Sequence, residues 1–211
     1  DTVVVGAIAE DSSATGVDGD GTCNCADESG AAYVFVRGPS GWTQQAYLKA
    51  SNSDWGAFFG WSVAVSGNTA VVGSPMESCG EAASGAAYVF VRSGTSWSEQ
   101  AYLKADNAGQ GDFLGWSVAV DGDIAVFGAP GEASGANTVD GDGTDNCAEF
   151  AGAAYVFTRS AGAWSQQAYL KASNAAEFAS FGTSVSVSGR TVLVGAYGES
   201  SVAEGSGAAY V

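Results

Sequence analysis

"SGAAYVFVR" at residues 29–37 decides the fold, because the chain returns to this stretch three more times. Each copy is short, rich in β-branched and aromatic residues and preceded by glycine, which is typical of a β-strand. A strand that recurs at this spacing predicts a protein built from repeats. The further copies are "SGAAYVFVR" at 84–92, "AGAAYVFTR" at 151–159 and "SGAAYV" at 206–211.

Two other segments recur in step with this strand. "WTQQAYLKA" at 42–50 returns at 97–105 and 164–172, and "FGWSVAVSGNTAVVGSP" at 59–75 returns at 114–130 and 181–197. Within the longer segment, "SGNT" predicts a tight hairpin turn, with glycine available for a positive φ. No window shows helical periodicity of useful length. The repeating unit is therefore four consecutive antiparallel strands, and "DTVVVGA" at the start of the chain is the tail of a further copy.

The composition of these strands predicts how the units pack. "AAYVFVR" is apolar on both faces, so each sheet needs a sheet stacked on either side; a β-propeller and a solenoid are the two repeat architectures that provide this. The small residues of "WSVAV" suit an innermost strand, and "WTQQAYLK" suits a partly wet outer strand. Among the tryptophans and the basic residues, only Trp55 and Arg190 do not recur at a fixed position of the repeat. The periodic large and basic residues are expected to be structural: Trp42, Trp97, Trp164, Trp61, Trp116, Arg37, Arg92, Arg159, Lys49, Lys104 and Lys171.

Charge and composition exclude several classes of function. The net charge is -16, from 23 acidic and 7 basic residues, and 46% of the residues are hydrophobic. Such a surface disfavours nucleic acid and anionic membranes and favours a divalent cation. The absence of histidine removes His-based nucleophile systems and His-ligated zinc. No apolar run approaches the roughly 18 residues of a membrane span, and no signal peptide is present, so a mature or trimmed product is expected.

The blade pattern resembles the FG-GAP repeat, the blade unit of the integrin α-subunit propeller and of many bacterial surface and secreted proteins. "FG" stands at Phe59-Gly60 and Phe181-Gly182, "GAP" at Gly128-Ala129-Pro130, and the "GAAYVF" strand follows. Degraded forms are "LG" at 114–115, "GSP" at 73–75, "GAY" at 195–197 and "GAI" at 6–8. The resemblance covers essentially the whole chain. It implies an all-β fold, a β-propeller of four-stranded antiparallel blades, used for extracellular adhesion or ligand binding and often stabilised by Ca²⁺.

The blade count leaves both ends open. The single array of residues 1–211 divides into a partial blade 1–54, a blade 55–109, a blade 110–177 and a partial blade 178–211, or about 3.5 blades. Raw strand edges at both ends invite pairing with another chain. We therefore expect either a fragment of a longer protein or an assembly subunit, joining as a homo-oligomer into a ring or a fibre.

The acidic residues do not occupy the family's usual calcium position. Between the first two strands of a blade the chain has only short turns, where Asp121 and Asp123 could make at most a weak site. Acidic residues gather instead between the second and third strands. These connections alternate in length: long at 10–30, short at 77–85, long at 132–152 and short at 199–207.

Both long loops contain D-G-D-G-T. Carboxylates separated by glycines let a loop wrap an ion, and Ca²⁺ takes six to eight oxygen ligands. A solvated Asp-Gly turn is the alternative interpretation, because Asp-Gly is also ordinary turn chemistry. The candidate calcium ligands are Asp18, Asp20, Thr22, Asp140, Asp142 and Thr144, with Asp27 or Glu28 and Asp145 or Glu149 completing the shells.

The four cysteines, Cys23, Cys25, Cys79 and Cys147, lie in polar loops. In this setting they suggest disulfides outside the cytosol, and four cysteines allow three pairings. Neighbouring Cys-x-Cys residues rarely bridge each other, and without histidine or a second pair they make a poor zinc site. A bridge from a long loop to the short loop of the neighbouring blade, such as Cys25 or Cys23 to Cys79, is one candidate, and the sequence does not choose among the three pairings.

Three functions follow from the sequence. The first is a non-enzymatic, extracellular adhesion or structural propeller. It is expected to bind an extracellular protein or glycan, not to bind nucleic acid and not to insert into a membrane. The second is a glycan-binding propeller, because Trp and Asp can line sugar pockets. The third is an enzyme with Asp140 and Asp142 as acid and base. This last is disfavoured, since both lie on a glycine-rich loop without a supporting scaffold.

Overall fold

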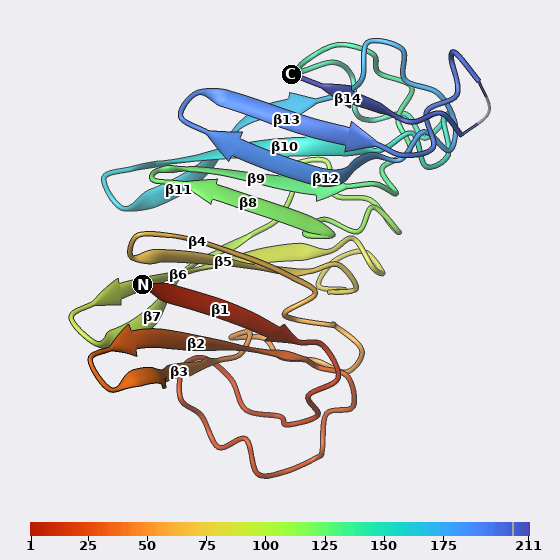
Figure 1. The fold of residues 1–211 in the computed structure, drawn as a ribbon. Helices are drawn as coiled ribbons and strands as arrows, with labels where there is room; N and C mark the ends of the chain where they lie inside the picture. Colours follow the sequence, from red (N-terminus) through yellow and green to blue (C-terminus); the bar gives the residue numbers. More distant parts are fainter. Residues whose placement is uncertain (204) are drawn as a thin grey trace.

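The computed structural model describes residues 1–203 and 205–211 and contains only β-structure within them (Figure 1). Four antiparallel sheets stack on one another, from the N-terminal sheet at the bottom of Figure 1 to the C-terminal sheet at the top. The stack is open, because its first and last sheets do not meet. The prediction of an all-β array of antiparallel blades is confirmed. None of the described residues form a helix that is long and apolar enough to cross a membrane.

Fourteen strands make up the four sheets. The first sheet contains β1 Thr2–Ala7, β2 Ala31–Gly38 and β3 Gly41–Leu48. The second contains β4 Ser62–Ser66, β5 Thr69–Ser74, β6 Ala86–Ser93 and β7 Ser96–Leu103. The third contains β8 Ser117–Asp121, β9 Ile124–Ala129, β10 Ala153–Ser160 and β11 Ala163–Leu170. The fourth contains β12 Phe181–Ser188, β13 Thr191–Ala196 and β14 Ala208–Tyr210.

Every sheet is a meander in which neighbours in sequence pair with each other. In the second sheet the first hairpin closes at the pair Ser66–Thr69, and Gly67 takes a φ of 58° in the turn. The third and fourth strands pair Tyr88 with Tyr102, and the register shifts immediately after Val89. The same shift recurs in the first and third sheets, so the local geometry of the blade repeats with the sequence.

The core lies between neighbouring sheets and depends on the third strand of each blade. Along β6, Tyr88 and Phe90 pack toward the first sheet, whereas Ala87 and Val89 pack toward the third sheet. All four side chains are fully buried. The expectation that "AAYVFVR" is covered on both faces is confirmed, and this burial is the main stabilising contribution between blades.

The repeated glycines mark the places where two blades touch. A Cβ on Gly73, in the "GSP" segment, would collide with the backbone carbonyl of Gly115, in the "LG" segment of the next blade. Gly128 and Gly182 meet in the same way. Ser62 Oγ and Ser117 Oγ donate to these two FG-type carbonyls at 2.7 and 2.8 Å. The GAP-type segment of one blade and the FG-type segment of the next therefore both need glycine, because the two backbones touch at this point.

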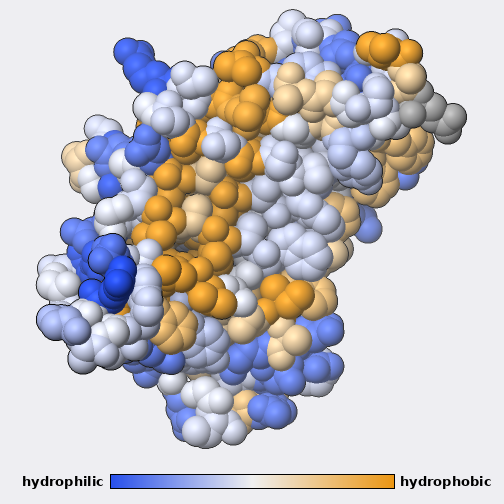
Figure 2. All heavy atoms as spheres, in the orientation of Figure 1, coloured by the Kyte–Doolittle hydropathy of each residue, from blue (hydrophilic) through white to orange (hydrophobic). Residues whose placement is uncertain are grey.

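The predicted inner and outer strands are found where the sequence places them. The first strands β4, β8 and β12 contact one another along the inner edge of the stack. Figure 2 shows a continuous hydrophobic band crossing the face of the molecule that these strands occupy. On the outer strands, Trp97 is buried between blades, and its Nε1 donates to Gln45 Oε1 of the preceding blade at 2.9 Å. Arg92 lies over the Trp97 ring, as Arg159 lies over Trp164, which confirms their structural role.

Candidate functional site: the loop rim

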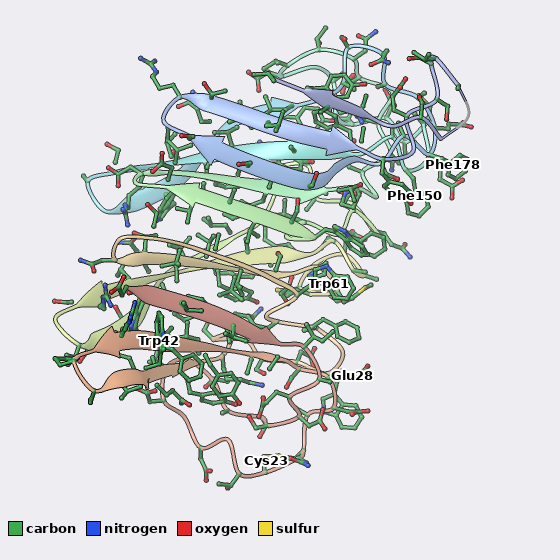
Figure 3. All side chains as sticks on the ribbon, in the orientation of Figure 1. Cys23, Glu28, Trp42, Trp61, Phe150 and Phe178 are labelled. Atoms are coloured by element: carbon green, nitrogen blue, oxygen red, sulfur yellow. A yellow bond between two sulfur atoms is a disulfide. The ribbon has the colours of Figure 1, made fainter. Side chains whose placement is uncertain are left out.

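One edge of the stack collects all the long connections of the repeat. Glu28, Trp61, Phe150 and Phe178 lie along this edge in Figure 3, whereas Trp42 lies toward the opposite edge. The edge contains the connections from second to third strands and from each blade to the next. We call it the loop rim; it comprises segments 8–30, 49–61, 75–85, 104–116, 130–152, 171–180 and 197–207, residue 204 excepted.

The first aspartate of each D-G-D-G-T segment holds its loop against an outer strand. Asp18 N donates to Tyr47 O at 2.8 Å, and Tyr47 N donates to Asp18 Oδ1 at 2.9 Å. Asp140 makes the same pair of bonds with Tyr169, both at 2.8 Å. The two bonds fix each loop to the neighbouring outer strand, so these carboxylates have a structural role.

The second aspartate closes a turn on the threonine that follows it. Asp20 Oδ1 accepts from Thr22 N at 3.0 Å and from Thr22 Oγ1 at 2.7 Å. Asp142 and Thr144 repeat this geometry at 3.0 and 2.6 Å. These hydrogen bonds hold the pKa of Asp20 and of Asp142 below the usual range. This is the local side-chain turn that competes with metal ligation for the same oxygens.

The predicted calcium ligands are not gathered around a common centre. Within residues 1–203 and 205–211, no group of three or more Asp, Glu, Cys or His side chains could hold a metal ion. Asp27 contributes its carbonyl to Gly56 N at 2.9 Å, and Asp145 Oδ1 accepts from Gly135 N at 2.8 Å. In this conformation the donor set does not fit the six to eight oxygens that calcium needs. Calcium binding stays a prediction.

The candidate bridge from Cys25 or Cys23 to Cys79 is not the one that this structure contains. Cys23 and Cys25 bridge each other, with Cα atoms 5.5 Å apart, while Cys79 and Cys147 are exposed free thiols. The chain bends between the two cysteines, and this brings their Cα atoms within ordinary disulfide range. In the second long loop Asp145 stands where the first has Cys23. Its carboxylate accepts from Cys147 Sγ at 2.9 Å, and this bond raises the pKa of the Cys147 thiol.

Several exposed aromatic side chains gather on the loop rim. Trp61 and Trp116, which follow the "FG" and "LG" glycines, contact each other with ring centroids 4.7 Å apart. Phe150 and Phe178 stack at 6.1 Å. Trp61 is 36% exposed and Phe178 56%, and Trp55 in the same rim is 70% exposed.

The sequence interpretation of the two rim tryptophans needs correction. Trp61 and Trp116 connect neighbouring blades, as their recurrence predicts, but they do so at the surface and belong to none of the buried clusters. The sequence does contain a signal for this surface position, because each tryptophan directly follows the glycine that precedes the innermost strand. It places both indoles at the rim end of that strand, where no further layer covers them.

The rim contains open depressions of different size. The one between the third and fourth sheets has a volume of about 120 Å³, which is below the roughly 300 Å³ at which ligand pockets for small molecules begin. A larger depression of about 380 Å³ lies beside the first D-G-D-G-T segment and is also open to solvent. The smaller depression is lined by Phe113, Trp116, Pro130, Phe150, Ser180, Thr183 and Tyr197, and the larger one by Glu10, Asp18, Gly19, Gly21, Thr22, Tyr33 and Tyr47.

Beneath the rim each of the first three sheets contains a lysine–glutamate pair that sequence reasoning missed. Lys171 Nζ donates to Glu132 Oε2 at 2.6 Å, and both side chains are almost completely buried. The partner glutamate always lies shortly after the "GAP" segment, so its recurrence was a readable signal. Tyr169 and Ser134 add hydrogen bonds, which makes this a structural network. The equivalent pairs are Lys49–Glu10 at 2.8 Å and Lys104–Glu77 at 2.7 Å.

Asp112 is a second buried acid under the rim, and it lacks a lysine partner of this kind. Burial raises its pKa to about 7, although its carboxylate accepts a hydrogen bond from Gly109 N at 2.6 Å. The neighbouring blades have Ala57 and Ala179 at the same repeat position. Asp112 is therefore an exception to the repeat.

These features define a class: an open stack of antiparallel blades of the β-propeller type, in which two sheets have four strands and two have three, with the longest loops on one rim. A family model described as "FG-GAP repeat" matches residues 42–90, 97–157 and 164–211, which together are most of the chain. The chain belongs to the FG-GAP repeat family. A search of curated proteins returned no match.

Proposed function

We propose that the chain is a non-enzymatic adhesion or structural module that acts outside the cell and contacts its partner through the loop rim. The observation that carries the proposal is the exposed aromatic surface of Trp61 and Phe178, with the half-buried Trp116 in contact with Trp61. Exposed aromatic side chains are enriched at protein interfaces, where they contribute much of the binding energy. The open rim favours adhesion over catalysis, because depressions that are open to solvent do not exclude water from a reacting group.

The charge of the molecule specifies the partner further. The chain carries a net charge of -16, and exposed acidic side chains such as Glu28, Glu149 and Glu177 lie in rim loops beside the aromatic rings. A protein surface with exposed Arg or Lys side chains complements both features, through cation–π contacts and through charge. We therefore propose an extracellular protein partner with a basic contact surface.

A location outside the cell is supported by the disulfide between Cys23 and Cys25 on the rim. Disulfides persist in oxidising compartments and are rare in the cytosol. The exposed thiols of Cys79 and Cys147 lie in other rim loops. Reduction by dithiothreitol, followed by mass spectrometry of alkylated peptides, checks the pairing.

Calcium is proposed as a stabiliser of the two long loops, on the strength of the duplicated D-G-D-G-T segment. Binding would require Asp20 and Asp142 to exchange their threonine hydrogen bonds for the ion. We expect calcium to raise the melting temperature relative to EGTA, and an Asp20→Asn, Asp142→Asn double variant to lose that rise. Identical melting curves in calcium and EGTA would end this proposal.

A glycan is the second candidate ligand, because exposed tryptophans such as Trp55 and Trp61 can stack on sugar rings. The two candidates are separated by probes. A synthetic decapeptide of alternating Arg and Gly tests the protein partner, and an array of neutral glycans tests the alternative. Quenching of tryptophan fluorescence by the peptide, with a negative array, supports the protein partner; the reverse result supports the glycan.

A further inference from the structure

The disulfide on the first long loop has a hydroxyl group beside it. Figure 3 shows Cys23 on this loop, below the stacked sheets. Ser13 Oγ lies 3.1 Å from Cys25 Sγ and 3.4 Å from Cys23 Sγ. Because the sulfur atoms of a disulfide carry no hydrogen, Ser13 is the donor. Ser13 and Cys25 are exposed and Cys23 is half-buried, so a reagent in solution can reach the bridge.

The second long loop keeps the same hydrogen bonds without a disulfide. The aspartate–tyrosine and aspartate–threonine bonds described above are present in both loops. Just after the bridge Ala26 N donates to Asp11 O at 2.7 Å, and at the same place in the second loop Ala148 N donates to Ala133 O at 2.8 Å. A disulfide that closes so short a segment also constrains the unfolded chain least. The bridge is therefore not what holds the first loop in its conformation.

The two loops differ at two positions that meet in space. The second loop has Asp145 at the position of Cys23 and Gly135 at the position of Ser13. There Gly135 N donates to Asp145 Oδ1 at 2.8 Å. In the first loop the Ser13 hydroxyl takes the place of this contact and lies against the sulfur atoms. The added cysteine and the added hydroxyl thus occur together in one loop, in contact with each other.

The exposure of the sulfur atoms belongs to the position in the loop. Cys147 occupies the position of Cys25 in the third sheet, which has a sheet stacked on either side (Figure 1). Cys147 is nevertheless exposed. A further sheet stacked beneath the first one would therefore leave Cys25 open to solvent.

The loop around the bridge is strongly acidic. Segment 8–30 contains six acidic residues and no lysine or arginine. Charges of one sign at the surface attract a reactant of the opposite sign and repel one of the same sign, most strongly at low ionic strength. The loop therefore favours a thiol that is flanked by basic groups. The exposed acidic residues are Asp18, Asp20, Asp27 and Glu28.

We propose that the Cys23–Cys25 bridge is a thiol–disulfide exchange site, which captures thiols flanked by basic groups as a mixed disulfide on Cys25. The incoming thiol loses its proton to solvent, and its thiolate attacks the exposed Cys25 Sγ. A bond forms between these two sulfur atoms, the bond from Cys25 to Cys23 breaks, and Cys23 leaves as a thiolate. Ser13 Oγ donates to this thiolate, which then takes a proton from water.

The capture is reversible and needs no external oxidant. Return attack of the Cys23 thiolate on Cys25 Sγ restores the bridge and releases the bound thiol. The hydrogen bonds on either side of the bridge, at Asp18 and at Ala26, keep the two cysteines close to each other after the bridge opens. Exposed disulfides are the exchangeable ones, whereas buried structural disulfides resist reduction.

The test uses the intact chain with Cys79→Ser and Cys147→Ser, which removes the two free thiols. The probe is the peptide acetyl-Arg-Cys-Arg-amide, and N-ethylmaleimide traps the product for peptide mass spectrometry. We expect one probe peptide on Cys25 and one maleimide group on Cys23. Attachment at Cys23 alone, or no mixed disulfide, would overturn the inference.

A second peptide tests the preference for basic thiols. Acetyl-Glu-Cys-Glu-amide should react about tenfold more slowly at low salt, and the difference should shrink in about 1 M salt. Each rate is divided by the rate of the same peptide with hydroxyethyl disulfide, which cancels the intrinsic reactivity of its thiol. Equal corrected rates at low salt would contradict the proposed specificity.

Variants of the loop separate exchange from a purely structural bridge. Ser13→Ala should slow exchange about tenfold, as expected for the loss of one hydrogen bond to a charged group, and Ser13→Thr should restore most of the rate. A Cys23→Ser, Cys25→Ser double variant should lower the melting temperature by only a few degrees. An unchanged rate in Ser13→Ala, or a fall on the order of 10 °C in the double variant, would overturn the inference.

The exchange does not depend on partner binding at the aromatic side chains of the rim. A Trp61→Ala, Trp116→Ala chain should therefore form the mixed disulfide at the rate of the parent chain. A matching loss of rate in this variant would show that the probe peptide reacts by way of the aromatic surface, and would contradict the assignment to the acidic loop.

Discussion

At the scale of single residues, Asp112 is the residue most out of keeping with its surroundings. Its pKa is raised to about 7 by burial, and an unfolded aspartate titrates near the ordinary value of 3.8. The folded state therefore holds a proton that the unfolded state releases between these values. The stability that this proton provides is present below about pH 4 and is lost as the pH rises through 7.

We expect Asp112→Ala to remove this loss, because the neighbouring blades already have alanine there. Melting temperatures of wild type and variant should be similar at pH 4.5, and the variant should be the more stable at pH 8. Exposed Glu81→Ala is the matched control and should follow the wild type. Parallel pH profiles for wild type and Asp112→Ala would contradict the assignment.

The inter-blade glycines yield a second residue-scale prediction. Gly128→Ala places a methyl group against the backbone of Gly182, which cannot move without separating two blades. We expect a loss of several kcal/mol in the free energy of unfolding, as for other severe core overpacking. Gly122→Ala is the control: its φ of 58° is strained for alanine, but open space surrounds it, so about 1 kcal/mol is expected. Chemical denaturation of both variants measures the difference, and equal losses would refute the close-contact explanation.

At the scale of the elements, a lysine–glutamate ion pair connects the end of each outer strand to the rim loop between the second and third strands of the same blade. Lys171→Met leaves the Glu132 carboxylate buried without its cation, and breaking such a pair costs about 3–5 kcal/mol. Lys104→Met should cost less, because the Lys104 side chain is 20% exposed. Urea denaturation should also show that Lys171→Met with Glu132→Leu recovers part of the loss. A double variant that is no more stable than Lys171→Met would contradict the buried-charge mechanism.

The elements also show what the sequence could predict. The strand sequences recur four times in the same order, so the repeat pattern and the local strand propensity predict the same structure. The predicted blade boundaries lie in loops. The conformation of the loops is harder to predict, because the same sequence allows a carboxylate such as Asp20 either to close a turn or to bind an ion. The Cys23–Cys25 bridge and the surface position of Trp61 depend on how the chain turns in three dimensions. The spacing of residues does not reveal that turn.

At the scale of the whole molecule, the open stack presents two unlike end faces. Val3 and Val5 on the first sheet are 41% and 46% exposed, although Ala70 and Val72 at the same repeat positions are fully buried. Leu193 on the last sheet is 44% exposed, whereas Val71 and Val126 at its repeat position are fully buried. Each face has the residues that a further blade would cover.

The loop rim lies across this stack and is the surface on which the proposed adhesion depends. The most direct test is a fluorescence titration of the chain with the alternating Arg-Gly peptide, comparing wild type with a Trp61→Ala, Trp116→Ala double variant. Trp42→Ala is the matched control, because Trp42 is 51% exposed but lies toward the opposite edge (Figure 3). The account predicts saturable binding for wild type and Trp42→Ala and at least a tenfold weaker affinity, about 1.4 kcal/mol, for the double variant. Equal affinities for all three chains, or no binding by the wild type, would contradict it.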